Sequence, residues 1–270
     1  MAEIEPSRAV VEAEETFDGR IIPDEQAELG RPVRLRDGAV VQGSVYGGTV
    51  EADEDVTVEG SVMAAEGIEL DGAHVGGEVG SPDKVLATDT HIDGTVTGQR
   101  VRLVDCVVRG NVVGANVILE DCIVLGIATA ERELAIEESL CYTFRSQGET
   151  TLENTTLVLP QAIAEGPLEL TTPVAVAGLG QIEVDDNDDG PAERLPEMGA
   201  DDLYEQDDTT YLTLAPRILN LEKITERLEK LEDAVMAAVD DTSGDDGTDM
   251  SVDDVLSLFD IDLRDETTPK

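Results

Sequence analysis

Two histidines are the side chains in this chain that are best suited to binding a metal ion. His74 and His91 differ by 17 in residue number, and each stands three residues before a glycine, Gly77 and Gly94. Imidazole is a common ligand of zinc, but a zinc site takes three or four protein ligands. The chain has no third histidine, and the sequence alone fixes no acid in register with the pair. We interpret the two as a solvent-exposed histidine ladder and predict no metal site, with a metal at His74 and His91 as the open alternative.

The three cysteines do not form a pattern typical of thiol chemistry. Cys106 and Cys122 differ by 16 in residue number, and Cys141 and Val124 differ by 17. The first two come within disulfide range if they stack, but so few cysteines indicate a reducing compartment and free thiols. Cys141 belongs to an apolar series with Val108 and Val124, where a buried thiol acts as a small hydrophobic group. No cysteine is in register with a histidine, so we predict no nucleophile.

The sequence carries no complete motif for catalysis or cofactor binding. The segment Asp185-x-Asn187-x-Asp189-Gly190 opens like a calcium-binding loop, but its twelfth position is Pro196, where a bidentate glutamate is required. There is no Gly-Lys-Ser/Thr phosphate loop, no Gly-x-Ser-x-Gly elbow and no dinucleotide-binding glycine motif after a strand. We therefore predict a protein that is not an enzyme and takes no cofactor.

The charge balance excludes several classes of partner. The chain has 270 residues, with 61 acidic and 18 basic side chains and a formal net charge of −43. It cannot neutralise a phosphate backbone, so we predict no nucleic-acid binding, and it lacks the basic clusters that attract anionic lipid. Such acidity with only 4 lysines is what we expect in a salt-filled cytoplasm, where salt screens charge repulsion. No signal peptide or membrane-spanning apolar run is evident, so we predict a cytoplasmic protein without direct membrane insertion.

The sequence contains an internal repeat with a period of 16 to 17 residues. This repeat indicates which secondary-structure elements must position the side chains described above. Glycines recur with steps of 17, 17, 17, 16 and 16, and each has a β-branched residue two positions before it. A second, apolar series recurs in phase with the first, with steps of 16 to 18. The glycines are Gly43, Gly60, Gly77, Gly94, Gly110 and Gly126, and the second series is Leu35, Ala52, Leu70, Leu86, Leu103, Leu119, Ile136, Leu152 and Leu170.

This period is typical of one coil of a β-solenoid. Period-2 alternation, as in Val101-Arg102-Leu103, places side chains alternately inside and outside, and glycines turn the corners. Residues 33–180 hold 19 of the 25 glycines, which excludes helices because each glycine costs a helix about 1 kcal/mol. We predict an all-β parallel β-helix over residues 33–180, with about nine coils and a period of 16–17.

The segments outside the predicted β-helix are acidic. Residues 1–32 are predicted to be a disordered acidic tail and residues 181–212 an acidic linker. Residues 213–240 are predicted to form an amphipathic heptad helix that docks on the rod's side, caps one of its ends or self-associates. Its apolar seam comprises Leu214, Leu221, Ile224, Leu228, Leu231 and Val235.

The C-terminal segment, residues 241–270, is predicted to be an acidic tail with one short helix at 252–259. One apolar face of that helix is a candidate partner-binding motif, and a frayed tail is the alternative. The motif comprises Val252, Val255, Leu256 and Phe259.

The rod of Val-x-Gly-x-Val coils between two acidic tails resembles the bactofilins, and the acidic composition resembles their haloarchaeal members, the halofilins. The resemblance covers residues 33–180 and rests on the repeat and the layout. It implies a right-handed β-helix that polymerises end to end, without nucleotide, into cytoskeletal filaments or patches that scaffold cell shape, often at the membrane. Because the sequence shows no apolar or basic N-terminal stretch, membrane attachment would run through a membrane-associated partner protein.

Self-assembly into a homopolymer is expected at the rod ends, where terminal coils leave backbone groups unpaired and the apolar interior open. A capped, non-polymerising interaction scaffold is the alternative function. A β-helix acyltransferase or carbonic-anhydrase-like enzyme is less favoured, because such enzymes show strict hexapeptide repeats and a catalytic histidine in register. The candidate end faces are Val33, Leu35, Val41 and Val45 in the first coil, and Leu168, Leu170, Val174 and Val176 in the last.

Overall fold

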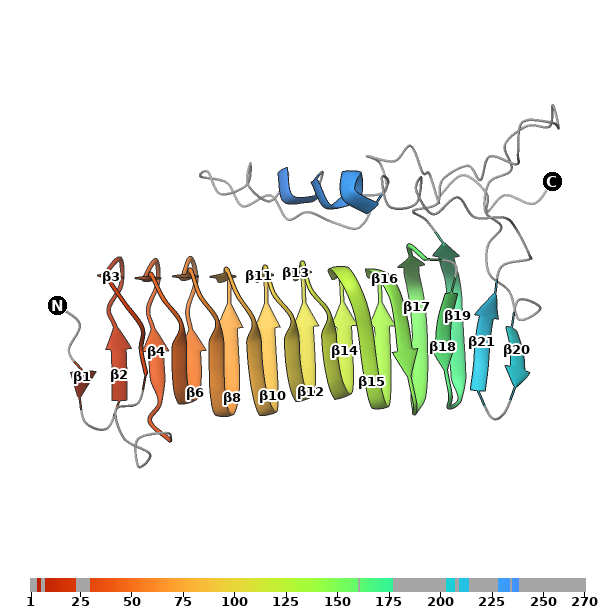
Figure 1. Ribbon diagram of the computed structural model, residues 1–270, viewed down its shortest axis with the longest axis horizontal. Helices are drawn as coiled ribbons and strands as arrows, with labels where there is room; N and C mark the ends of the chain where they lie inside the picture. Colours follow the sequence, from red (N-terminus) through yellow and green to blue (C-terminus); the bar gives the residue numbers. More distant parts are fainter. Residues whose placement is uncertain are drawn as a thin grey trace.

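A computed structural model describes the chain at residues 4–5, 8–22, 30–159, 161–176, 203–206, 209–213, 228–233 and 235–237. Most of these residues are in β-strands, and the strands form one 21-stranded sheet that winds into a rod of stacked coils (Figure 1). Consecutive coils pair in parallel, and paired residues are 16 or 17 apart along the centre of the rod. The predicted all-β solenoid is therefore confirmed.

The strands of the rod are of two main kinds, short strands of two residues and long strands that bend around a corner. The short strands are β3 (Thr16–Phe17), β5 (Val40–Val41), β7 (Thr57–Val58), β9 (His74–Val75), β11 (His91–Ile92) and β13 (Val107–Val108). The long strands are β6 (Val45–Ala52), β8 (Val62–Asp71), β10 (Val79–Thr88), β12 (Val96–Val104), β14 (Val112–Glu120), β15 (Ile123–Glu137), β16 (Leu140–Ser146), β17 (Glu149–Leu157) and β19 (Leu168–Val176). The remaining strands are β1 (Ile4–Glu5), β2 (Arg8–Val11), β4 (Val33–Leu35), β18 (Gln161–Ala164), β20 (Leu203–Gln206) and β21 (Thr209–Thr213).

Each coil in the centre of the rod has three sides. A long strand supplies two of them, because a shift in pairing register, as between Gly47 and Thr49, separates its two straight parts. The short strands stack on one another and form the third side, which we call the short-strand face. This face continues through the start of β15, the start of β16 and the end of β17. Strand alternation then points one residue of each pair into the interior and the other outward.

Aliphatic side chains fill the interior in columns, and every residue in two of these columns is at most 1% exposed. Full burial of one such side chain stabilises the folded state by about 1.5–3 kcal/mol. Because these residues flank the glycine series in the sequence, the apolar period predicts the core. The column behind the short-strand face is Val41, Val58, Val75, Ile92 and Val108, and a column on a long-strand side is Val45, Val62, Val79, Val96 and Val112.

Stacked glycines build the corner that follows the short-strand face. A Cβ atom on Gly110 would lie 2.6 Å from the backbone of Gly94, and one on Gly94 would lie 2.6 Å from the backbone of Gly77. The spacing between coils therefore leaves no room for a side chain here, and glycine is required at each step.

The rod begins earlier than the sequence period predicts. Residues 8–22 form a further coil, because β2 pairs in parallel with β4, β3 pairs with β5, and Ile21 bridges to Val45. The predicted disordered tail at 1–32 is therefore wrong for residues 8–22, and also for residues 4–5, which form β1 and pair with β2. Val11 pairs with Leu35, and this step is much longer than the regular one, so a search for steps of 16 to 18 passes over this coil.

A short antiparallel extension adds to the other end of the rod. Strands β20 and β21 pair with each other, and β21 pairs antiparallel with β18. The predicted acidic linker at 181–212 is therefore wrong for residues 203–206 and 209–212. Tyr204 and Tyr211 lie opposite one another in this hairpin, and aromatic and β-branched residues favour strands over solvated linkers.

Candidate functional site

The two histidines lie on neighbouring coils of the short-strand face. His74 in β9 pairs with His91 in β11, and their ring centroids are 4.8 Å apart with an interplanar angle of 24°. Their strand neighbours, Val75 and Ile92, point into the interior and are fully buried, so both imidazoles point outward. The stacking predicted from their spacing in the sequence is confirmed.

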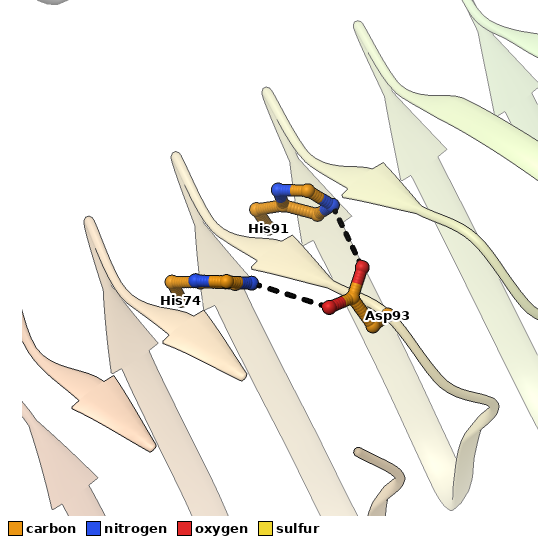
Figure 2. A group of neighbouring side chains, drawn as sticks. All are labelled: His74, His91 and Asp93. Carbon is orange, nitrogen blue, oxygen red and sulfur yellow. Dashed lines mark hydrogen bonds and ion pairs between the residues drawn. The ribbon is translucent and has the colours of Figure 1, made fainter. Parts of the chain in front are cut away.

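Asp93 joins the two imidazoles, as Figure 2 shows. Its Oδ2 atom is 3.4 Å from Nε2 of His74, and its Oδ1 atom is 3.3 Å from Nε2 of His91. The side chains of His74, Asp93 and His91 are 48%, 26% and 13% exposed, so the cluster is open to solvent on the His74 side. Among the described residues, this is the one group of three or more potential metal ligands.

Gly76 explains how Asp93 reaches a histidine on the preceding coil. The amide of Asp93 donates to the Val75 carbonyl, and the amide of Gly76 donates in the same way to Val58. Gly76 and Asp93 are therefore equivalent positions on neighbouring coils, and no side chain at Gly76 separates the carboxylate from His74. The sequence analysis missed this acid, although Asp93 stands two residues after His91 and strand alternation places both on the outer side.

A charged contact continues from the cluster toward the C-terminal helix. Arg109 lies one coil beyond Asp93, and its Nε atom donates a hydrogen bond of 2.7 Å to Oε1 of Glu232. This hydrogen bond, together with the negative charges of Glu232 and Asp93, raises the pKa of Arg109 above its ordinary value. Asp93 thus contacts two imidazoles and also acts through its charge on the guanidinium of Arg109.

The predicted heptad helix lies along the flank of the rod. Residues 228–233 and 235–237 are helical and lie alongside the rod (Figure 1). Leu231 and Val235 are buried against the outer side of the short-strand face, with Leu228 partly buried beside them. The helix therefore docks on the rod's side in its described part. Leu214, Leu221 and Ile224 lie outside the described residues. The surface beneath the helix comprises Ile123, Leu125, Leu140 and Val158, with Val107 and Tyr142 at its edge; we call it the flank patch.

The candidate end face at the N-terminal side of the rod is not an end. Val33, Leu35, Val41 and Val45 are fully buried, because the coil formed by residues 8–22 covers them. Ala9, Val11 and Ile21 take the terminal positions instead and are themselves buried.

The candidate end face at the other side belongs to β19, the last long strand. Leu168 packs against the core, and the backbone register places Leu170 opposite Leu152 and Val176 opposite Leu157. Val174 lies opposite Thr155 in the same register. β19 pairs with β17, and no other described strand pairs with its outer edge. The candidate partner motif, Val252, Val255, Leu256 and Phe259, lies outside the described residues.

The three cysteines are buried free thiols, and the burial predicted for Cys141 is confirmed. Cys141 pairs in register with Val124 in the interior column, and burial raises its pKa to about 12. Burial, followed by the hydrogen bond and charge of Cys106, also raises the pKa of Cys122. A raised pKa disfavours the thiolate, which is the reactive form.

In comparisons with known proteins, no family model, no curated protein and no solved structure matches the chain. Within the described residues, no helix has both the length and the apolar character that a membrane span needs. The fold and the side chains define a β-solenoid protein that carries a histidine–aspartate cluster and a helix docked on its flank.

Proposed function

We propose that this chain is a non-enzymatic cytoskeletal scaffold that assembles end to end through its β-helix into nucleotide-independent polymers that contribute to cell shape. The observation that carries the proposal is the outer edge of β19. Across the described residues, this nine-residue strand pairs with β17 alone. An open edge of this length presents unpaired N–H and C=O groups that a strand of a second chain can pair with.

The interior columns support the same mode of assembly. Leu170 and Val176 continue the register of Leu152 and Leu157, which are at most 1% exposed. Stacking of a further coil on β19 would continue this register from one subunit to the next and so extend the apolar columns.

The sides of the rod disfavour lateral association. Residues 33–180 carry 24 acidic and 8 basic side chains, so rods lying side by side repel one another. At molar salt the Debye length is about 3 Å, and this repulsion is then confined to direct contacts. The end strand β19 carries one charged residue, Glu169, among its nine residues, so charge opposes pairing less at this edge than along the sides.

A pair of double variants tests the proposal by electron microscopy of purified protein in multimolar KCl. We expect filaments from the wild-type chain and folded, unassembled particles from Leu170→Asp/Val174→Asp, because two carboxylates at the end face cannot be buried without a large cost. The matched control is Val113→Asp/Ile127→Asp, which adds two carboxylates at positions 36% and 41% exposed along the rod. Unchanged filaments from the end-face variant would rule out assembly through β19.

A capped, non-polymerising interaction scaffold is the second candidate, and the antiparallel strands at both ends favour it. β1 pairs with the outer edge of β2, and β21 pairs with the outer edge of β18. Each pairing covers one side of a terminal coil and reduces the open edge. Discrete particles from the wild-type chain at all protein concentrations would support this candidate, and the search for a partner would then begin with Val252, Val255, Leu256 and Phe259.

A further inference from the structure

The histidine–aspartate cluster has the composition of a metal site. We propose that His74, His91 and Asp93 bind one divalent transition-metal ion, of which Zn²⁺ is the representative, through the two Nε2 atoms and the Asp93 carboxylate. Two imidazoles and a carboxylate are ligands typical of zinc and other first-row divalent ions, whereas Ca²⁺ and Mg²⁺ prefer oxygen ligands. Three protein ligands leave at least one coordination position open for water.

The distances between ligand atoms fit a metal better than they fit hydrogen bonds. The two Asp93–imidazole separations are 3.4 and 3.3 Å, whereas charge-assisted N–H···O bonds measure about 2.7–2.9 Å. In a tetrahedral site with metal–ligand bonds of about 2.0–2.1 Å, neighbouring ligand atoms lie about 3.3–3.4 Å apart. The three ligand atoms all lie within 4.8 Å of one another. A small rotation of the exposed His74 ring would therefore bring its Nε2 atom into position as the third ligand of the metal ion.

The Asp93 carboxylate provides an independent indication of a bound cation. Its Oδ1 atom is buried and accepts no hydrogen bond from the described part of the chain. A buried oxygen left without a donor costs about 1–3 kcal/mol, and more when it is charged. A metal ion between Asp93 and the imidazoles would compensate this cost, and Arg109 is already engaged by Glu232.

The backbone holds the ligands in place before any metal binds. The amides of His91 and Asp93 each donate a 2.9 Å hydrogen bond to the preceding coil, and Ile92 between them is fully buried. Two of the three ligands are thus fixed on one rigid strand segment, so little conformational entropy is lost on binding. The more exposed His74 is the ligand that adjusts.

Titration of the full-length chain with Co²⁺ tests the site, because Co²⁺ held by nitrogen and oxygen ligands in a four- or five-coordinate site absorbs visible light more strongly than the hydrated ion. The protein is first treated with a chelator and then titrated in molar KCl, which screens the general attraction of the acidic surface for cations. We expect a saturable visible band at one Co²⁺ per chain that excess Zn²⁺ abolishes. A flat titration up to millimolar Co²⁺ would overturn the proposal.

Single substitutions locate the site. We expect His74→Gln, His91→Gln and Asp93→Asn each to weaken Co²⁺ binding at least about tenfold, since even changes in the outer shell of a metal site cost 10- to 100-fold. Asp83→Asn is the matched control, because it removes an exposed carboxylate that pairs with Arg100 elsewhere on the rod, and its titration should equal that of the wild type. His74 is 48% exposed, so its replacement leaves the fold intact, which circular dichroism without metal verifies. Equal affinity in the wild type, His74→Gln and Asp93→Asn would show that Co²⁺ binds elsewhere.

Discussion

At the scale of single residues, one corner of the coil restricts which residue types can occupy two successive positions of the repeat. Asp89, Asp105 and Asp121 adopt positive φ angles of 48°, 52° and 52°, a conformation that aspartate tolerates better than most residues. The residue that follows each corner donates a hydrogen bond to the carbonyl two positions before it. Thr90, Cys106, Cys122, Ser139 and Thr155 all do so.

The cysteines at this corner are therefore structural. Cys106 and Cys122 occupy positions equivalent to Thr90 and Ser139, and each sulfur donates to a carbonyl at 3.1 Å. In the sequence, an aspartate directly precedes each of these two cysteines. The aspartate adopts the positive φ angle of the corner, and the cysteine that follows it donates a hydrogen bond to the backbone. This arrangement does not indicate an activated nucleophile.

We predict that none of the three thiols reacts with a disulfide reagent such as DTNB in the folded protein at pH 8. Burial raises the pKa of Cys141 to about 12, so its thiolate is scarce at pH 8, and the reagent cannot reach the interior. Absorbance of the released thiolate should report three thiols per chain in denaturant and none in its absence. One thiol reacting rapidly in the folded protein would contradict the assignment.

The same pKa shift predicts how stability depends on pH. The folded-state pKa of Cys141 lies above the ordinary value of 9.0, so between about pH 9 and pH 12 the unfolded chain releases a proton that the folded protein keeps. The unfolded state then binds fewer protons, and stability falls as pH rises. Below that range both states are protonated, and this contribution is fully present. Cys141→Val should flatten the decline of the urea midpoint between pH 8.5 and 10.5.

The histidine cluster shows what single-residue patterns can predict. The spacing of His74 and His91 in the sequence predicts that they stack, because equivalent positions of a solenoid lie one above the other. The spacing does not predict the contact with Asp93, because Asp93 belongs to a different column of outward-facing residues. Asp93 reaches His74 because Gly76, at the equivalent position of the preceding coil, has no side chain. Contacts between two columns depend on the directions of side chains at the edge of a face. The sequence period does not determine these directions, which require the three-dimensional structure.

At the scale of elements, the short-strand face changes character along the rod. Its outward positions are His74 and His91 near the middle, and then Val107, Ile123 and Leu140 farther on. In its described part, the helix packs on the apolar residues of this face, and its Glu232 also accepts a hydrogen bond from Arg109. A heptad seam in the sequence predicts an apolar helix face but not its partner, because a rod flank and a second helix bury such a seam equally well.

We predict that Val235→Asp releases the helix from the flank patch. Val235 is fully buried, and loss of its burial costs about 1.5–3 kcal/mol, to which the buried carboxylate adds a desolvation cost. That loss raises the undocked fraction more than about tenfold. Limited trypsin digestion followed by mass spectrometry should show correspondingly faster cleavage after Lys230.

Ala237→Asp is the matched control for this variant, because it adds the same charge at an exposed position of the same helix. Its cleavage rate should equal that of the wild type. Glu232→Gln should have only a small effect, since the pair it forms with Arg109 is partly exposed and such pairs contribute about 0–1 kcal/mol. Equal protection in Val235→Asp and the wild type would show that the flank patch does not hold the helix.

The elements that sequence analysis missed all depart from the regular period. The coil at 8–22 is separated from the next by a longer insertion, so the paired residues Val11 and Leu35 fall outside the regular step. The hairpin of β20 and β21 pairs antiparallel and so has no reason to follow the coil length. Periodicity predicts the stacked coils well, but it does not predict the strands that pair with the terminal coils of the rod.

At the scale of the whole molecule, the protein is an elongated rod whose two ends differ (Figure 1). β1 covers β2 at one end, whereas β21 covers β18 and leaves the outer edge of β19 without a described partner at the other. A net charge of −43 opposes any association of such rods. The Debye length is about 10 Å at 0.1 M salt and about 3 Å at 1 M, so end-to-end contacts should form more readily as salt rises.

A truncation that ends at Gly180 tests whether the C-terminal hairpin limits assembly. It removes β20 and β21 and so frees the edge of β18 beside that of β19, which leaves more of the terminal coil open for pairing. We predict longer polymers and a lower critical concentration than for the full-length chain, measured by sedimentation and electron microscopy in multimolar KCl.

The truncation also removes the helix and uncovers the flank patch, which could drive association along the sides. Val235→Asp in the full-length chain separates the two effects, because it uncovers the flank patch and retains β21 on β18. If the hairpin limits growth, the truncated chain forms long single filaments while Val235→Asp keeps the polymer length of the wild type. Bundles in both variants would instead assign the change to the flank patch, and equal lengths in all three chains would show that β21 does not restrict the end.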